Sequence, residues 1–100
     1  MNRENVILAL RSLERKLVLE GVEHLYLFGS VARNEATDQS DIDIAFDVRP
    51  EFELKFSLID QSRLQRELSS ALDRRVDFVE RAYLYPSIGA SAAQDMIRIF

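Results

Sequence analysis

An alternation of acidic and apolar side chains marks residues 41–48, which begin Asp-Ile-Asp-Ile. Successive side chains of a β-strand point to opposite faces of a sheet, so this pattern predicts a strand with two unlike faces. Asp41 and Asp43 are two residues apart and are expected on the same face. The apolar face of this strand has to be buried by other elements of the chain.

Two more strands are expected from short apolar runs at residues 24–28 and 75–79, the first of them rich in aromatic residues. Amphipathic helices are expected over residues 4–19 and 52–72, where apolar residues recur every three or four positions. The stripe of the second helix consists of Leu54, Leu58, Leu64, Leu68 and Leu72.

Two shorter helices complete the expected elements. One is a brief helix over residues 30–33. The other is a weaker terminal helix after Pro86 that carries an apolar stripe of Ile88, Ala92, Met96 and Ile97. The stretch between residues 34 and 40 is polar and is expected to be a loop.

The lengths of the connections predict how the strands pair. Residues 49–74 hold a full helix, which is the length that a parallel crossover requires. The link from Ser30 to Asp41 is too short for one, so the first two strands are expected to be antiparallel, with Gly29, Ser30 and Asp41 as neighbours at one edge. The predicted fold is α/β, a small mixed sheet covered by helices, in a single domain spanning residues 1–100.

Composition narrows the chemistry. The formal net charge of −4 argues against stable binding of duplex nucleic acid. With no cysteine and His24 as the only histidine, thiolate and histidine metal sites are excluded, and any metal has to be held by oxygen. The chain has no long apolar run typical of a membrane span or a signal peptide, so a cytoplasmic protein is expected.

The acidic residues and one glycine suggest a phosphate and metal site. Two carboxylates on one face of a strand repel each other, and Mg²⁺ is the cation that carboxylate oxygens prefer. Asp77, in the third strand, could complete such a site. Gly29 allows the backbone to approach a phosphate closely, and the Ser30 hydroxyl can donate to its oxygens.

Each feature also has an ordinary structural reading. An Asp-x-Asp pair is commonly a solvated strand end, and Gly-Ser is commonly a turn. Asp77 could pair with one of the nearby arginines, Arg74, Arg75 or Arg81. It is the joint occurrence of these features, in this order and at these spacings, that favours a functional site.

The motif Phe-Gly-Ser-Val-Ala-Arg at residues 28–33, followed by Ser-Asp-Ile-Asp-Ile at 40–44 and Arg-Val-Asp-Phe-Val at 75–79, resembles the DNA polymerase beta type nucleotidyltransferase superfamily. Within it the chain is most similar to the minimal nucleotidyltransferases, or MNT proteins. The family commonly has a glycine after the position of Arg33, where this chain has Asn34. Asparagine tolerates a left-handed turn, so little loss is expected.

The resemblance implies roles for particular residues. Asp41 and Asp43 would bind two Mg²⁺ ions together with a nucleoside triphosphate, ATP in the leading interpretation. Asp77 would bind the catalytic metal and help to activate the attacking hydroxyl. Gly29 and Ser30 would contact the triphosphate, and Arg33 could neutralise phosphate charge or be an ordinary surface arginine.

The resemblance also implies a partner. MNT proteins act as antitoxins of HEPN-type RNase toxins and transfer AMP to a tyrosine of the toxin, and the terminal helix, with Ile88, Met96, Ile97 and Phe100, is the expected contact. Two alternatives stay open. One is an antitoxin that neutralises by contact alone, and the other is a homodimeric enzyme that modifies a small hydroxylated molecule.

Overall fold

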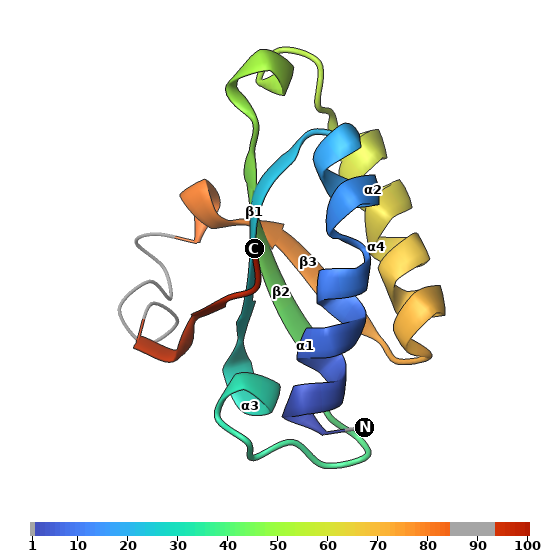
Figure 1. The fold of residues 1–100 in the computed structure, drawn as a ribbon, viewed down its shortest axis with the longest axis vertical. Coiled ribbons are helices and arrows are strands. Elements are labelled where there is room, and N and C mark those ends of the chain that lie inside the picture. Colours follow the sequence, from blue (N-terminus) through green and yellow to red (C-terminus); the bar gives the residue numbers. More distant parts are fainter. Residues whose placement is uncertain (1, 85–93) are drawn as a thin grey trace.

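The computed structural model describes residues 2–84 and 94–100. Within these residues the chain forms a mixed sheet in the spatial order β3-β2-β1-β4 (Figure 1). β1 and β2 are antiparallel, whereas β2 and β3 are parallel, as the connection lengths predicted. The strands are β1 (Val22–Phe28), β2 (Ile42–Val48), β3 (Val76–Glu80) and β4 (Ile97–Arg98).

The longer helices lie together on one face of the sheet (Figure 1). They are α1 (Arg3–Ser12), α2 (Glu14–Leu19) and α4 (Leu58–Leu72). Alternate residues of β2 point toward them, so that Ile42, Ile44 and Phe46 are buried and the Phe46 ring stacks on Phe78 at 4.2 Å. The expected α/β fold, a small mixed sheet covered by helices, is therefore confirmed.

The opposite face of the sheet carries a smaller apolar cluster. Phe28, Ala45 and Leu84 are buried there, and Tyr26 and Val79 pack against them. The short elements α3 (Gly29–Ala32), η1 (Pro50–Phe52) and η2 (Arg81–Tyr83) extend from strand ends. Asp43 and Asp47 alternate with the inward residues of β2, so they belong to this second face.

The first helix is interrupted, which corrects the prediction of one continuous helix over residues 4–19. Leu13 separates α1 from α2 and has φ −97° and ψ 2°. Its N–H donates to the Leu10 carbonyl at 3.1 Å. Val6, Leu10 and Leu17 are nevertheless buried as predicted, because a one-residue change in the hydrogen bonding hardly disturbs the apolar spacing.

The second helix begins later than predicted. α4 starts at Leu58, where the Ser57 Oγ accepts from the Asp60 N–H at 3.3 Å and the Asp60 carboxylate accepts from the Ser57 N–H at 2.9 Å. This capping box fixes the helix start. Leu54 and Leu58 were assigned to the buried stripe, but they are 102% and 79% exposed. Leu64, Leu68 and Leu72 are buried as expected.

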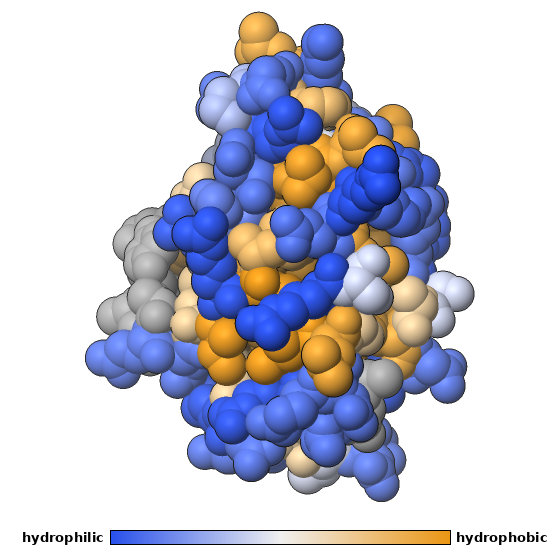
Figure 2. Space-filling view, viewed as in Figure 1, coloured by the Kyte–Doolittle hydropathy of each residue, from blue (hydrophilic) through white to orange (hydrophobic). Residues whose placement is uncertain are grey.

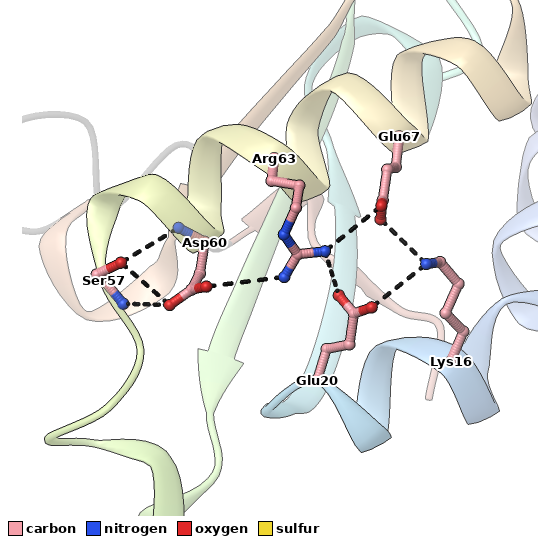
Figure 3. Close-up of polar contacts among 6 residues, drawn as sticks. All are labelled: Lys16, Glu20, Ser57, Asp60, Arg63 and Glu67. Atoms are coloured by element: carbon pink, nitrogen blue, oxygen red, sulfur yellow. Dashed lines mark hydrogen bonds and ion pairs between the residues drawn. The ribbon is translucent and has the colours of Figure 1, made fainter.

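A network of charged side chains joins α2 to α4 (Figure 3). The Arg63 guanidinium binds Glu20 at 2.9 Å and Glu67 at 3.4 Å. Lys16 lies 3.3 Å from Glu20 and 3.1 Å from Glu67, so each cation contacts a carboxylate of the other helix. The network sets the two helices side by side over the sheet.

The chain end is a strand where a terminal helix was expected. Ile97 pairs with Leu27 of β1, and both Ile97 and Phe100 pack against the main core. The Ile99 N–H donates to the Leu25 carbonyl at 2.7 Å, because the edge of β1 offers unpaired backbone groups. The predicted helical stripe is therefore wrong at Ile97, while Ile88 and Ala92 lie outside the described residues. None of the helices in residues 2–84 and 94–100 is long and apolar enough to span a bilayer.

Candidate functional site

Two carboxylates meet on the second face of the sheet. Asp43 of β2 and Asp77 of β3 are direct partners in the parallel pairing. Asp77 is exposed, because the helices cover the other face. The backbone pairing therefore brings together two of the three predicted acidic residues.

Gly29 lies directly beside Asp43. It follows Phe28, which is the β1 partner of Asp43, and it has φ +74°. A Cβ at this position would collide with the Asp43 carboxylate and come within 3.0 Å of its Cγ. Only glycine fits both the left-handed backbone and the close approach. Asp41 was expected to be the neighbour of Gly29, but the atoms nearest to this position all belong to Asp43.

Burial and neighbouring charge raise the pKa of Asp43 from 3.8 to about 6. Removal from water is the largest cause. The next is Asp77, which acts both through its charge and through a hydrogen bond between the two carboxyl groups, and Asp41 adds a smaller repulsion. The charge of Arg33 opposes these effects. Asp43 thus lies at the centre of a site that disfavours its own negative charge.

Asp41 lies just before β2, and its negative charge adds to the repulsion at Asp43. Its carboxylate is 3.9 Å from the guanidinium of Arg75, which is 81% exposed. No group of three His, Cys, Asp or Glu within residues 2–84 and 94–100 converges tightly enough to hold a metal ion. The acidic residues that the backbone pairing places together are therefore Asp43 and Asp77, and Asp41 is the residue beside Arg75.

Arg74 anchors the loop that leads to Asp41. Its guanidinium donates to the carbonyls of Thr37 at 3.1 Å and of Ser40 at 2.6 Å. The Ile42 N–H donates in turn to the Arg75 carbonyl at 2.9 Å. Sequence reasoning considered Arg74 only as an ion-pair partner of Asp77. No sequence signal indicates its contacts, because they are made to backbone groups far along the chain.

The turn after β1 contains a residue in the left-handed backbone conformation. Asn34 has φ 61°, so it adopts the conformation expected where the family has glycine. The Ser30 carbonyl accepts from the Glu35 N–H at 2.8 Å, which closes the turn, and the Ser30 side chain is half-buried. Arg33 extends from this turn and binds Asp95 at 2.9 Å and Glu35 at 3.1 Å.

A second polar group on the same face was missed by the sequence analysis. The Asp47 carboxylate accepts two hydrogen bonds from Arg81, at 2.8 and 3.1 Å, and one from the Tyr26 hydroxyl at 3.0 Å. The Arg81 guanidinium also lies over the Tyr26 ring at 4.9 Å. His24 is half-buried, and its ring and that of Tyr26 are in a T-shaped arrangement with centroids 6.3 Å apart. Asp47 continues the alternation of β2, which was the available signal.

The chain matches a family model described as the nucleotidyltransferase domain over residues 6–99. It belongs to this family. The expected enzyme class, a nucleotidyltransferase, is confirmed with it. In this nucleotidyltransferase the matched residues include both Asp43 and Asp77.

Two curated relatives cover most of the chain. A Methanocaldococcus jannaschii protein named as a candidate protein adenylyltransferase is 40% identical over 70 residues, which are 70% of this chain and 71% of that protein. The protein adenylyltransferase MntA of Thermococcus cleftensis is 33% identical over 79 residues, with 79% and 76% covered.

Two solved structures share the fold. One is described as a candidate minimal nucleotidyltransferase; it has a TM-score of 0.76 and 31% identity and covers 97% of this chain and 95% of its own. The other is a toxin–antitoxin crystal structure with AMP-PNP, with a TM-score of 0.71, 25% identity and coverage of 90% and 72%. The resemblance to minimal nucleotidyltransferases found in the sequence is confirmed.

Proposed function

We propose that this chain is a metal-dependent protein adenylyltransferase that transfers AMP from ATP to a tyrosine hydroxyl of a HEPN-type RNase and thereby acts as its antitoxin. The MntA relative is named a protein adenylyltransferase, and a similar solved structure is a toxin–antitoxin complex with AMP-PNP. These names support the nucleotide donor and the protein acceptor. The metal, the tyrosine and the HEPN-type partner rest on the resemblance and on the chemistry of the site.

The observation that carries the proposal is the Asp43–Asp77 pair beside Gly29. Two carboxylates held in register by backbone pairing, one of them with a raised pKa, form a concentrated negative charge. Such a pair is costly unless it binds a cation or holds a proton. The glycine next to it lets the Asp43 carboxylate lie against the backbone, where any other side chain would collide with it.

Mg²⁺ suits this donor set, because its ligands are carboxylate oxygens and a bound cation would relieve the repulsion that raises the pKa of Asp43. Asp43 and Asp77 would hold it, with Asp41 joining once it leaves Arg75, and two ions are proposed. When bound, Mg²⁺ supplies Lewis-acid stabilisation of the charge on the phosphates.

The remaining residues bind and orient the nucleotide. Gly29 lets the backbone approach the triphosphate, and the Ser30 hydroxyl donates to one of its oxygens. Arg33 neutralises phosphate charge after exchanging its contacts with Asp95 and Glu35. These assignments make the turn after β1 the phosphate-binding part of the site.

In the proposed reaction the tyrosine oxygen forms a bond to the α-phosphorus of ATP. The bond from this phosphorus to the oxygen that bridges the α- and β-phosphates breaks, and pyrophosphate leaves. The hydroxyl proton passes to the Asp77 carboxylate, which is exposed on the open face and therefore accessible to an acceptor.

The test is to incubate the chain with the HEPN-type protein encoded beside it, ATP and Mg²⁺, and to follow the mass of the partner. One or more adenylyl additions on tyrosine are expected. The double variant Asp41→Ala/Asp43→Ala should prevent the addition, whereas Asp38→Ala, which removes an exposed loop carboxylate, should not.

If the double variant neutralises the RNase as well as the wild type and neither changes its mass, the chain acts as an antitoxin by contact alone. If a small hydroxylated compound is adenylylated in the absence of any protein acceptor, the acceptor is a small molecule and not a protein. Transfer that persists in EDTA would contradict the role of the metal.

A further inference from the structure

Exposed apolar side chains gather at one end of the molecule. Among the described residues six large apolar side chains are exposed, and four of them belong to the segments that flank the carboxyl ends of β2 and β3. Large exposed side chains concentrated in one region commonly indicate an interaction site. The four are Leu54, Leu58, Ile59 and Tyr83, with exposed fractions of 102%, 79%, 79% and 79%.

The surface is hollowed between these side chains. Leu54 and Tyr83 line a cavity of about 490 Å³ together with Val48 and Phe56. On the other side of Tyr83 lies a second cavity of about 350 Å³, lined by Leu58 and others. The segment that begins with η1 forms the tip of the molecule in Figure 1, and Figure 2 shows apolar atoms among polar ones at this tip.

The charged residues that line the larger cavity are all acidic, namely Asp47, Glu53 and Glu80. Burial raises the pKa of Glu80, and the negative charges of Asp47 and Glu53 add to this effect. Arg81 binds Asp47 at 2.8 Å. The lining of this cavity therefore combines apolar side chains with acidic ones, and we call it the acidic groove.

We propose that the acidic groove seats a segment of the HEPN-type partner in which basic side chains accompany large apolar ones. This inference rests on the proposed function, because it names the surface that recruits the acceptor protein. Apolar side chains of the segment would cover Leu54, Leu58 and Tyr83. Its basic groups would complement the acidic side chains that line the groove. The negative charge of these side chains favours a cationic occupant and disfavours an anionic lipid surface.

The position of the groove suits an acceptor. Asp47 and Asp43 lie on the same face of β2 and are four residues apart, a separation of about 13 Å along the strand. A partner segment held in the groove therefore brings neighbouring residues within a short peptide length of the Asp43–Asp77 pair. The earlier expectation assigned this contact to the terminal segment, but Ile97 and Phe100 pack against the core.

The test measures the affinity of the purified HEPN-type partner for three variants by calorimetry. Leu54→Ser/Tyr83→Ser should weaken binding at least tenfold, because it removes two apolar contacts. Glu53→Gln/Glu80→Gln should weaken binding and reduce its dependence on salt. The matched control, Leu8→Ser/Leu19→Ser, changes the exposed apolar residues of α1 and α2, and it should bind like the wild type.

The role of the groove in binding is contradicted if Leu54→Ser/Tyr83→Ser binds the partner with wild-type affinity. Its thermal unfolding midpoint shows whether the variant is folded. Self-association of the wild-type chain that this variant loses would assign the groove to a second copy, and binding to anionic vesicles that it loses would assign it to a membrane. Either result overturns the proposal.

Failure of the proposed function looks different. If Asp41→Ala/Asp43→Ala binds the partner like the wild type and the wild-type chain itself transfers no AMP, the catalytic role fails while the groove stands. If the wild-type chain does not bind the partner at all, the partner and the groove assigned to it both fail.

Discussion

Asp43 and Asp77 occupy one register position of the parallel β2–β3 pair, on the face of the sheet opposite the helices. Strand pairing holds their Cα atoms at a fixed separation, whatever the side chains bind. Burial of Asp43, followed by the charge of Asp77, raises the pKa of Asp43. The chain therefore carries a local destabilisation at the position where the proposed chemistry needs it.

The substitution Asp43→Asn should stabilise the metal-free chain near neutral pH. A folded-state pKa of about 6 against 3.8 means that the folded chain holds the proton more tightly, so wild-type stability falls as pH rises from about 4 to about 6. The expected gain in the free energy of unfolding from Asp43→Asn is at most about 3 kcal/mol. Solvent screening at this half-buried group reduces it to about 1 kcal/mol.

Urea unfolding in EDTA at about pH 4 and about pH 7 checks this gain, which should vanish at the lower pH. Asp38→Asn in the exposed loop is the control and should have no effect at either pH. A destabilised Asp43→Asn at neutral pH would show that the carboxylate makes a favourable contact that outweighs the repulsion.

The substitution Gly29→Ala should abolish nucleotidyl transfer and lower stability by about 1–3 kcal/mol, because φ +74° is unfavourable for alanine and the methyl group collides with the Asp43 carboxylate. Gly21→Ala is a matched control, since Gly21 has φ +112° and its Cβ would come within 2.9 Å of the Phe52 ring. Gly21→Ala should lose stability but retain transfer per folded molecule. Equal losses of transfer activity in the two variants would contradict a specific role of Gly29 in nucleotidyl transfer.

The substitution Arg74→Ala should weaken Mg²⁺ binding without abolishing it, because it frees the carbonyls of Thr37 and Ser40 and loosens the approach to Asp41. Two hydrogen bonds from a charged donor suggest a stability loss of about 1–3 kcal/mol. Arg66→Ala, an exposed position on α4, is the control. Calorimetric titration measures the Mg²⁺ affinity of both variants. An unchanged Mg²⁺ affinity in Arg74→Ala would show that the hydrogen bonds of Arg74 stabilise the fold without supporting the metal site.

The substitution Arg63→Met should cost about 1 kcal/mol at low salt and less at high salt, because Arg63 joins Glu20 to Glu67 in a partly exposed network. Thermal unfolding at two salt concentrations measures this loss. Transfer activity should be unchanged, since the network lies among the helices and not on the acidic face (Figure 3). A loss independent of salt would indicate that packing of the Arg63 stem matters more than its charge.

Sequence reasoning found β1, β2 and β3 because their signals are local, but it missed β4. The alternation through Asp43 identified β2, and the length of the connection after Val48 established the parallel pairing with β3. The same reasoning missed the break at Leu13, since apolar spacing continues across it. It also placed Leu54 in a helix, although the capping residues Ser57 and Asp60 were present in the sequence as a signal.

The sequence predicted which residues form the candidate site better than it predicted how they are arranged. The residues Gly29, Asp43 and Asp77 do meet, but Asp77 is exposed and Gly29 contacts Asp43 where Asp41 was expected. The proximity of Arg75 to Asp41 depends on side-chain orientation, which no spacing rule describes. The roles of all these residues in binding and catalysis stay predictions.

The parallel pairing of Asp43 with Asp77 also bears on how the chain can tolerate changes in length. The loop between α3 and β2 can gain or lose residues and shift Asp41, yet the separation of Asp43 from Asp77 is set by the strand ladder alone. Insertions in the crossover before α4 would likewise leave the pair in register. Related chains could thus acquire new segments around an unchanged acidic centre, and diversify in what they modify without rebuilding it.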